Sequence, residues 1–435
     1  MTHISILSVF PSLYDEFLKT SLVKRAQIEQ KISFNVAGFS SFCALKERID
    51  GPTVGHGQGM AIRPEVVERS VDALEATHGK AFKVFVTPQG KKLTQPVARS
   101  IASHIKNSEH VMFVAGRYEG IDERVHEEYA DLEISIGDYV LMGGDLPVMV
   151  ILEASLRYVE GVVGRNASVE DDSFSGAFVD YPTFTVPPRV WRERAIPEVL
   201  LSGNHAAMDA WRTTVAVRNS VIHHFDWVRS HVQSSQERKY VAQALPHHYV
   251  ALLHDDVLVQ NGVVGTSSVT SMDIHDIARS SKTYGIKEYF LVTSLKDQQK
   301  IVETLLYFWH TAGVEYNENR SEAVGIVALK ESLAAVLEAI EKKEGVKPLV
   351  IGTAARSIEE IELISYHDQE MVWKQSRPVL FIFGTAKGLS EAVLKKCDYL
   401  LMPVEGFTQF NHLSVRSAVA IILDRWMGLN RAKAS

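Results

Sequence analysis

Cysteine, long apolar runs and an excess of basic charge are all scarce in this sequence. Its two cysteines, Cys43 and Cys397, lie far apart among 435 residues, which excludes a disulfide framework and a cysteine-based zinc site. No apolar run reaches the roughly 18 residues that a membrane-spanning helix needs. The N-terminal segment has neither the basic head nor the small-residue cleavage site of a secretory signal. We therefore expect a cytoplasmic protein without a membrane partner.

The net charge of −7 argues against indiscriminate binding of nucleic acid, and we expect no DNA partner. A structured RNA held by a local basic patch stays compatible with this charge. The segment RVWRERA at residues 189–195 is such a patch. The alternative for this segment is an ordinary solvated helix face.

Strand-like and helix-like segments alternate in two parts of the chain, which predicts two α/β domains with largely parallel sheets. In the first part, residues 64–79 have apolar residues at helical spacing and end at a glycine, so they predict a helix. Strands are expected at 4–10, 83–88, 249–255, 288–294, 323–329, 348–353 and 379–384.

Two apolar runs end in glycine-bearing loops, VMFVAGRYEGIDE at 111–123 and VLFIFGTAKGLSE at 379–391. The dinucleotide fingerprint needs three glycines after the first strand of a domain, and the second loop has only two of them. Too little chain follows Gly384 for the remaining βαβ units. No G-K-[ST] phosphate loop exists either. A dinucleotide-dependent oxidoreductase is therefore a weak alternative, which predicts that NAD binds.

The same series of segments follows each of the two loops. Each is followed by a second apolar stretch, a second glycine- or proline-bearing loop (135–147 and 400–414) and a long apolar helix. The last helix carries Val415, Val419, Ile422 and Trp426 on one stripe, and further apolar residues extend round it. A helix that is apolar on most faces is buried, here against a partner subunit.

Five segments of the first half form a specific set: FVTPQGKKL (85–93), GRYEGIDERV (116–125), SIGDYVLMGGDLP (135–147), EDDSF (170–174) and VLLSGNH (199–205). Through them, residues 1 to about 243 closely resemble the bacterial tRNA (guanine-37-N1)-methyltransferase family. Residues 273–286, 383–389 and 411–421 are similar to the three motif regions of ribose 2′-O-methylating SPOUT-class RNA methyltransferases.

The resemblance implies an α/β fold with two SPOUT domains, each closed by a C-terminal trefoil knot that holds bent S-adenosylmethionine at a homodimer interface. True knots are rare, so only the resemblance supports them. The expected organisation is a knotted domain at 1–163, a flexible linker at 164–177, a helical tRNA-binding domain at 178–243 and a second knotted methyltransferase-like domain at 247–435. The expected activity is methylation of guanosine 37 of tRNA.

Methylating guanine N1 requires a base for the N1 proton and a partner for the charge that develops on O6. The resemblance gives these roles to Asp172 and Arg157. The alternative is an exposed loop aspartate and a surface arginine. Asp172 lies on the expected linker, so tRNA should order it. Glu119 is expected near the sulfonium, and Glu119 and Asp172 are the candidate ligands of a Mg²⁺ ion.

The expected cofactor shell of the first domain follows the same motifs. By resemblance it comprises Thr87, Pro88, Gly116, Tyr118, Glu119, Ile136, Gly137, Asp138, Tyr139, Val140, Leu141, Gly143, Gly144 and Pro147. For Tyr139 and Leu141, simple core packing is the alternative. One departure concerns GHGQGM at 55–60, where His56 and Gln58 replace small or rigid residues beside the expected guanine pocket. His56 is more simply a loop histidine than a catalytic base.

In the second domain, the resemblance assigns a cofactor shell of Thr353, Phe383, Gly384, Gly388, Leu401, Met402, Pro403, Asn411, Leu413 and Ser414. Arg279 is the expected activating group for a ribose 2′-hydroxyl. The first motif usually opens with asparagine, and here Asp273 stands in that place. A non-catalytic RNA-binding and dimerisation module is the alternative for this half.

Overall fold

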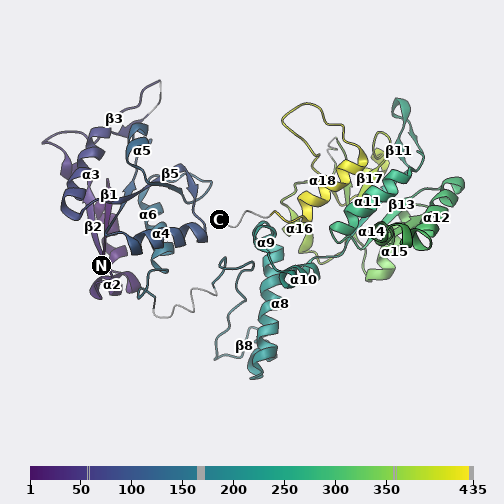
Figure 1. The fold of residues 1–435 in the computed structure, drawn as a ribbon, viewed down its shortest axis with the longest axis horizontal. Coiled ribbons are helices and arrows are strands. Elements are labelled where there is room, and N and C mark those ends of the chain that lie inside the picture. The colour runs from purple at the N-terminus through teal and green to yellow at the C-terminus, as the bar shows by residue number, and fades with distance from the viewer. Residues whose placement is uncertain (56, 58, 164–171, 356–357, 359, 431–435) are drawn as a thin grey trace. The chain divides into compact units, whose positions relative to one another are not determined.

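The computed structural model describes residues 1–55, 57, 59–163, 172–355, 358 and 360–430. The chain divides into two compact units, residues 1–175 and 176–435 (Figure 1). Both are α/β units built on parallel sheets. None of the helices in the described part of the chain is long and apolar enough to cross a membrane.

The first unit contains a five-stranded sheet with the order β2–β1–β6–β5–β7, and all of its strand pairs are parallel. Its strands are β1 (Thr2–Ser8), β2 (Ile32–Gly38), β5 (Phe82–Lys92), β6 (His110–Ala115) and β7 (Leu132–Ser135). The small hairpin of β3 (Asp50–Pro52) and β4 (Met60–Ile62) stands apart from the sheet. The expected strands at 4–10 and 83–88 are thus confirmed as β1 and β5.

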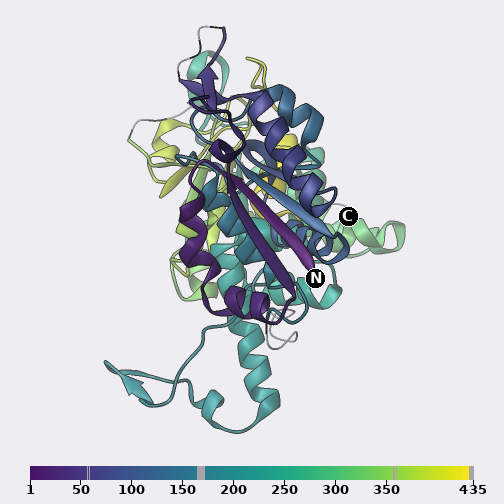
Figure 2. The same ribbon diagram turned by 90° about the vertical axis from the view of Figure 1, so that its left-hand side faces the viewer.

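Helices cover both faces of this sheet, as the purple and blue elements of Figure 2 show. One hydrophobic cluster joins the sheet to α2, α4 and α6, and the other joins it to α3 and α5. The helices are α1 (Asp15–Leu18), α2 (Ser21–Ile28), α3 (Pro64–His78), α4 (Gln95–Asn107), α5 (Glu123–Tyr129) and α6 (Asp145–Leu156). The expected helix at 64–79 is confirmed, because proline begins α3 and Gly79, with a φ of 83°, ends it.

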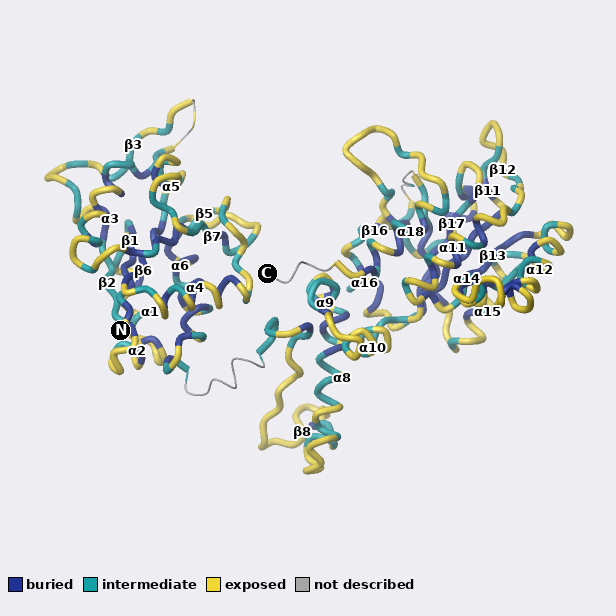
Figure 3. Tube along the Cα trace, viewed as in Figure 1, coloured by how far each residue is buried: buried dark blue, intermediate teal, exposed yellow. Residues whose placement is uncertain are grey.

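The second unit contains a seven-stranded parallel sheet with the order β14–β13–β10–β17–β15–β18–β16. Its strands are β10 (His248–Leu253), β13 (Glu288–Val292), β14 (Val327–Lys330), β15 (Leu349–Thr353), β16 (Leu363–Ile364), β17 (Val379–Gly384) and β18 (Tyr399–Leu401). Strand β10 is buried along its whole length. So is β6 of the first unit, as Figure 3 shows. The expected strands are all present, although β14 begins later than predicted because 323–324 end a helix.

The sheet of the second unit is likewise covered on both faces. Its helices are α11 (Ser271–Thr283), α12 (Lys296–His310), α13 (Gly313–Tyr316), α14 (Glu318–Val324), α15 (Leu333–Glu344), α16 (Gln369–Trp373), α17 (Glu391–Leu394) and α18 (Val415–Met427). The short hairpin of β11 (Val257–Leu258) and β12 (Val264–Gly265) follows β10. The expected stripe on α18 is buried at Val419, Ile422 and Trp426, whereas Val415 is partly exposed.

The helical segment before this sheet shares the hydrophobic core of the second unit. It comprises α8 (His205–His223), α9 (Phe225–His231) and α10 (Ser235–Ala244). The ring of Phe225 packs edge-on against Trp373, with 4.8 Å between centroids. Arg229 donates to the backbone carbonyls of Asp424, Arg425 and Gly428 at 2.8–2.9 Å, where α18 ends. Its positive charge therefore stabilises the negative end of the α18 dipole.

The basic segment 189–195 is not a helix face. It forms the exposed hairpin of β8 (Val190–Trp191) and β9 (Arg194–Ala195). The guanidinium of Arg192 lies 4.8 Å from the centre of the Trp191 ring, whose side chain is exposed.

His248, the first residue of β10, makes a buried polar contact that joins three elements. Its Nε2 accepts the indole N–H groups of Trp373 at 3.3 Å and Trp426 at 3.1 Å. Its Nδ1 donates to the carbonyl of Pro246 at 2.7 Å. Since an indole only donates and a carbonyl only accepts, these contacts fix the neutral tautomer. Burial lowers the pKa of His248 from 6.5 to about 4.

This histidine should make the second unit sensitive to acid. Unfolded His248 takes up a proton below about pH 6.5, whereas the folded residue does so only below about pH 4. The free energy of unfolding should therefore fall between these pH values, by about 3 kcal/mol at most, and change no further below them. The lowered pKa values of His254 and His275 act in the same direction.

Urea unfolding at a series of pH values tests this expectation. All six tryptophans lie in the second unit, so their fluorescence reports on that unit. His248→Leu should lower stability at pH 7 by about 1–3 kcal/mol, because the buried indole N–H groups of Trp373 and Trp426 lose their acceptor. It should also flatten the dependence between pH 4 and 6.5. Parallel pH curves for wild type and variant would contradict the assignment.

Candidate functional site

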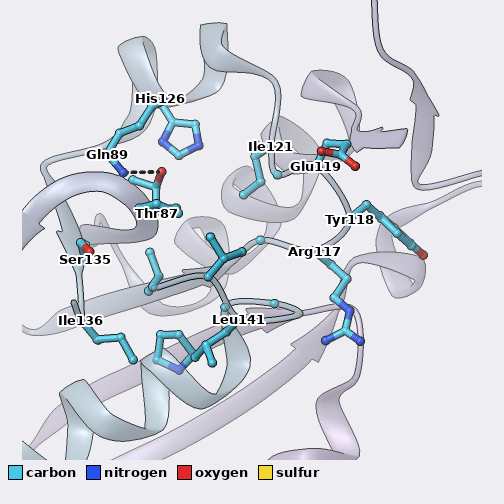
Figure 4. A pocket seen from close by; sticks show the side chains of 18 of the residues that line it. Thr87, Gln89, Arg117, Tyr118, Glu119, Ile121, His126, Ser135, Ile136 and Leu141 are labelled. Carbon is cyan, nitrogen blue, oxygen red and sulfur yellow. Dashed lines mark hydrogen bonds between the residues drawn. The ribbon is translucent and has the colours of Figure 1, made fainter. Parts of the chain in front are cut away.

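A cavity of about 350 Å³ lies where the strands β5, β6 and β7 lead into their loops. Its walls come from the middle of β5, the loop after β6, the loop after β7 and the first turn of α6. In Figure 4, Thr87 and Gln89 lie on one side of it, Tyr118 and Glu119 on the other, and Ile136 and Leu141 below. Parallel α/β sheets bind ligands at this end of their strands.

Of the residues predicted for the first cofactor shell, all but Asp138 line this cavity. Asp138 instead pairs with Lys92 on the exposed surface, with 2.5 Å between Oδ2 and Nζ. The cavity also has walls that the sequence did not predict: Val86, Gln89, Arg117, Gly120, Ile121, Glu123, His126 and Ser135. Most are sequence neighbours of predicted residues.

His126 had no signal in the sequence beyond its place on the helix after the glycine loop. It reaches the cavity from α5, and its Nδ1 lies 2.5 Å from an oxygen of Glu133 on β7. The ring centre lies 5.0 Å from that of Phe85. The carboxylate thereby fixes the orientation of the imidazole at the wall.

Close backbone approach brings the loops together. The N–H of Gly144 donates to the carbonyl of Gly116 at 2.8 Å, and a Cβ on Gly144 would lie 2.9 Å from the nitrogen of Gly116. Gly137 has a φ of 155°, and a Cβ there would meet the Tyr139 ring at 2.4 Å. The Tyr139 and Leu141 side chains are 57% and 39% exposed, so these residues form the wall and are not core packing.

Asp145 anchors the first turn of α6, which completes the cavity. It is buried, and its Oδ1 accepts from Ser8 at 2.5 Å and from Tyr14 at 3.1 Å. Burial and the neighbouring carboxylate raise the pKa of Tyr14 far above its ordinary value, so its hydroxyl stays a donor. The contact ties α6 to the end of β1 and so holds the glycine pair before the helix in place.

Asp172 and Arg157, the predicted base and O6 partner, are brought together. They form a direct ion pair between a guanidinium nitrogen and Asp172 Oδ2. Arg157 directly follows α6, and both side chains are partly exposed. Neither residue lines the cavity. His56, Gln58, Glu170 and Asp171 lie outside the described residues.

Glu119 is exposed at the cavity wall, and its backbone N–H donates to the carbonyl of Met60 at 2.9 Å. Across the described residues, no group of three or more His, Cys, Asp or Glu side chains could hold a metal ion. Within the described part of the chain, Glu119 and Asp172 therefore have no third such side chain beside them.

A second cavity, of about 850 Å³, lies at the corresponding ends of β15, β17 and β18. Every residue predicted for the second cofactor shell lines it. Further walls are Ser267, Ser268, Thr270, Asp273, Ala354, Ala355, Thr385, Ala386, Lys387, Val404, His412, Val415, Ala418 and Ile422. A Cβ on Gly384 would lie 2.5 Å from the nitrogen of Leu389, and Gly388 has a φ of 96°.

Two polar residues of α11, Arg279 and Asp273, differ in their position relative to the second cavity. Arg279 is exposed and lies outside the cavity. Asp273, which begins the same motif, is only 8% exposed and lines the cavity. Its Oδ2 accepts from Thr270 Oγ1 at 2.6 Å, and Arg416 Nε lies 3.5 Å from its Oδ1.

Two protein families match this chain. Residues 2–230 match the family described as tRNA (Guanine-1)-methyltransferase TrmD. Residues 247–428 match a family described as SAM-dependent RNA methyltransferase.

Curated relatives match along the whole chain. A tRNA (guanine-N(1)-)-methyltransferase of Nitratidesulfovibrio vulgaris is 33% identical over 98% of this chain and 99% of its own length. One of Oleidesulfovibrio alaskensis is 31% identical with the same coverage. One of Bacillus subtilis is 35% identical over 55% of this chain and 98% of its own length.

Among solved structures, the tRNA (m1G37) methyltransferase of Aquifex aeolicus is 30% identical over 48% of this chain and 87% of its own, with a TM-score of 0.41. The whole-length relatives and the match over more than half of the sequence lead to one conclusion. The chain belongs to the tRNA (guanine-1)-methyltransferase TrmD family, and its C-terminal half is a second, SAM-dependent RNA methyltransferase domain.

Proposed function

We propose that the chain transfers methyl groups from S-adenosylmethionine at two sites. The first site methylates N1 of guanosine 37 of tRNA, next to the anticodon. The second methylates a ribose 2′-hydroxyl of RNA. One observation carries the proposal: the predicted cofactor residues of each half converge on a cavity at the same ends of a parallel sheet. The trefoil knots expected for both halves belong to this proposal.

Both cavities fit a nucleoside-like methyl donor. Gly116 and Gly144 in the first, and Gly384 in the second, leave backbone groups free of side chains beside the ligand. Tyr139 adds an aromatic wall to the first cavity. The bound cofactor supplies an electrophilic methyl group, while this chain orients the acceptor and removes its proton.

The Asp172–Arg157 ion pair matches the edge of guanine. Guanine presents a donor at N1 and an acceptor at O6 side by side, and the pair presents an acceptor and a donor side by side. A guanine that enters between them would replace the direct contact of Arg157 with Asp172 by two new ones, from N1–H to Asp172 and from Arg157 to O6. Asp172 would then take the N1 proton, and Arg157 would stabilise the charge on O6.

A Mg²⁺ ion at Glu119 and Asp172 fits less well. The described residues gather no third ligand around them. No step of the mechanism is therefore assigned to the ion.

A homodimer in the cytoplasm completes the proposal. Val415, Ala418 and Ile421 of α18 are apolar and partly exposed, which suits a partner subunit. Cys43 and Cys397 are both free thiols, as expected in a reducing compartment.

One observation favours the alternative that the second half binds RNA without modifying it. Arg279, the expected activating group, lies outside the cavity. Mass-spectrometric mapping of 2′-O-methylnucleosides in RNA treated with the full chain distinguishes the two. A ribose methyl that depends on the protein supports the second enzyme.

Asp172→Asn should slow methylation of guanosine 37 by about 10²–10⁴-fold, because the amide cannot take the N1 proton. Single-turnover transfer of labelled methyl to a tRNA transcript with guanosines 36 and 37 measures the effect. Binding of S-adenosylhomocysteine should not change, since Asp172 does not line the cavity. Asp138→Asn is the matched control, because that carboxylate pairs with Lys92 outside the cavity. Full activity of Asp172→Asn would reject its role as the base.

Calorimetry should find two S-adenosylhomocysteine molecules bound per chain and no NAD. Gly384→Ala should reduce this number to one, because its Cβ would lie 2.5 Å from the backbone nitrogen of Leu389. Gly406→Ala is the control, since a Cβ there meets nothing within 4 Å. Two binding events in Gly384→Ala, or one in wild type, would contradict the assignment of the second cavity.

A further inference from the structure

The second cavity needs a proton acceptor if it methylates a hydroxyl, so this inference rests on the proposed function. In that reaction the acceptor oxygen bonds to the methyl carbon while the carbon–sulfur bond breaks. The sulfonium becomes the neutral thioether of S-adenosylhomocysteine, and the hydroxyl proton must leave. Since the product is a neutral ether, the protein needs to supply only one basic group, which takes this proton.

A chain of hydrogen bonds fixes the hydroxyls at this cavity. Thr385 Oγ1 donates to the carbonyl of Leu253 at 3.1 Å, which can only accept. The Ser267 hydroxyl lies 2.5 Å from Thr385 Oγ1 and must therefore donate to it. His254 Nδ1 lies 3.1 Å from Ser267 Oγ and so donates to that hydroxyl.

Thr270 follows the same rule, because its hydroxyl donates to Asp273 Oδ2 at 2.6 Å. The hydrogens of Ser267, Thr270 and Thr385 are thus all committed to other protein atoms. What these three side chains offer to the cavity is lone pairs. A ligand hydroxyl beside them is oriented with its hydrogen toward the protein and an oxygen lone pair toward the cofactor.

Only one of these acceptors has the basicity to keep the proton. Asp273 is the only carboxylate among the described residues that line the cavity. Only 8% of Asp273 is exposed to solvent. Its contacts with Thr270 and Arg416 leave lone pairs free on both oxygens. His254 lies one hydrogen bond behind the wall and does not line the cavity.

We propose that Asp273 is the catalytic base of the second site and takes the proton of a ribose 2′-hydroxyl as the methyl group is transferred. Ser267 and Thr385, held by His254, act as positioning residues that orient this hydroxyl. The carboxylate at the motif position usually occupied by asparagine thus supplies the activating group, and Arg279 does not.

Three charged or titratable groups face Asp273 from the elements around it. Arg416 on α18 contacts Asp273 and also bonds to Asp276 at 3.1 Å. His254, after β10, and Tyr289, on β13, both interact electrostatically with the carboxylate. Arg416 thus places a positive charge beside the carboxylate, with Nε 3.5 Å from Oδ1.

The test uses the full chain, labelled S-adenosylmethionine and bulk RNA from cells that lack the gene. Mass spectrometry separates 2′-O-methylnucleosides from 1-methylguanosine, so each site is read independently. Asp273→Asn keeps the shape and the bond from Thr270. It should lower 2′-O-methylation by about 10²–10⁴-fold and abolish the acidic limb of its pH–rate profile. Binding of S-adenosylhomocysteine and formation of 1-methylguanosine should not change.

Asp276→Asn is the matched control, because Asp276 lies on the same helix and also binds Arg416 but does not line the cavity. It should keep its 2′-O-methylation and its pH profile. An Asp273→Asn protein with wild-type rate, or with a reduced rate and an unchanged pH profile, would overturn the role of the base. A wild-type protein that forms 1-methylguanosine but no 2′-O-methylnucleoside would overturn the second activity itself, and this inference with it.

Discussion

The close packing of backbone against backbone at the ends of parallel strands is the constraint on which both sites depend. At Gly144 a single methyl group would collide with the backbone of the loop after β6, and at Gly384 with the backbone of the loop that follows it directly. The loops therefore converge without side chains between them, and the space that remains is shaped by main-chain atoms. Elements farther away serve this arrangement, since the buried bonds of Asp145 hold the helix that follows the first glycine pair.

The two cavities share this backbone arrangement but differ in the charged side chains at their edges. Beside the first, a carboxylate and a guanidinium from separate segments neutralise each other directly. At the second, the arginine nearest the carboxylate is shared with Asp276, and hydroxyls with committed hydrogens fill the wall. A ring nitrogen beside a carbonyl needs the first arrangement, whereas an alcohol needs only a base and an orientation. With the proposed functions, two parallel-sheet domains would accommodate two kinds of acceptor through a few side chains.

Much of the architecture was predictable because its signals are local. Strands such as β1 and β17 are continuous apolar runs, and the cofactor loops are contiguous segments whose residues enter the cavities together. The position of Arg279 outside the second cavity could not be read from the motif, because motif similarity does not fix which way a helical residue faces. Thr385 and Ser267 were missed because their bond joins positions 118 residues apart, which only the folded chain brings together. His126 was missed for a different reason, because only the fold shows that its helix brings the ring to the cavity and to Glu133 on β7.

The hydrogen bonds from Arg229 to the end of α18 connect the two parts of the chain that match different families. The TrmD family match reaches residue 230, so Arg229 and Phe225 belong to it, yet they pack against the other methyltransferase domain. The relative of Bacillus subtilis matches only 55% of this chain but 98% of its own length. A cut near residue 245 would therefore expose Trp373 and leave three carbonyls of α18 without their donor. Helices of the first family match and the second methyltransferase domain share one hydrophobic core. The boundary between the two family matches in the sequence is therefore not a boundary between independently packed domains.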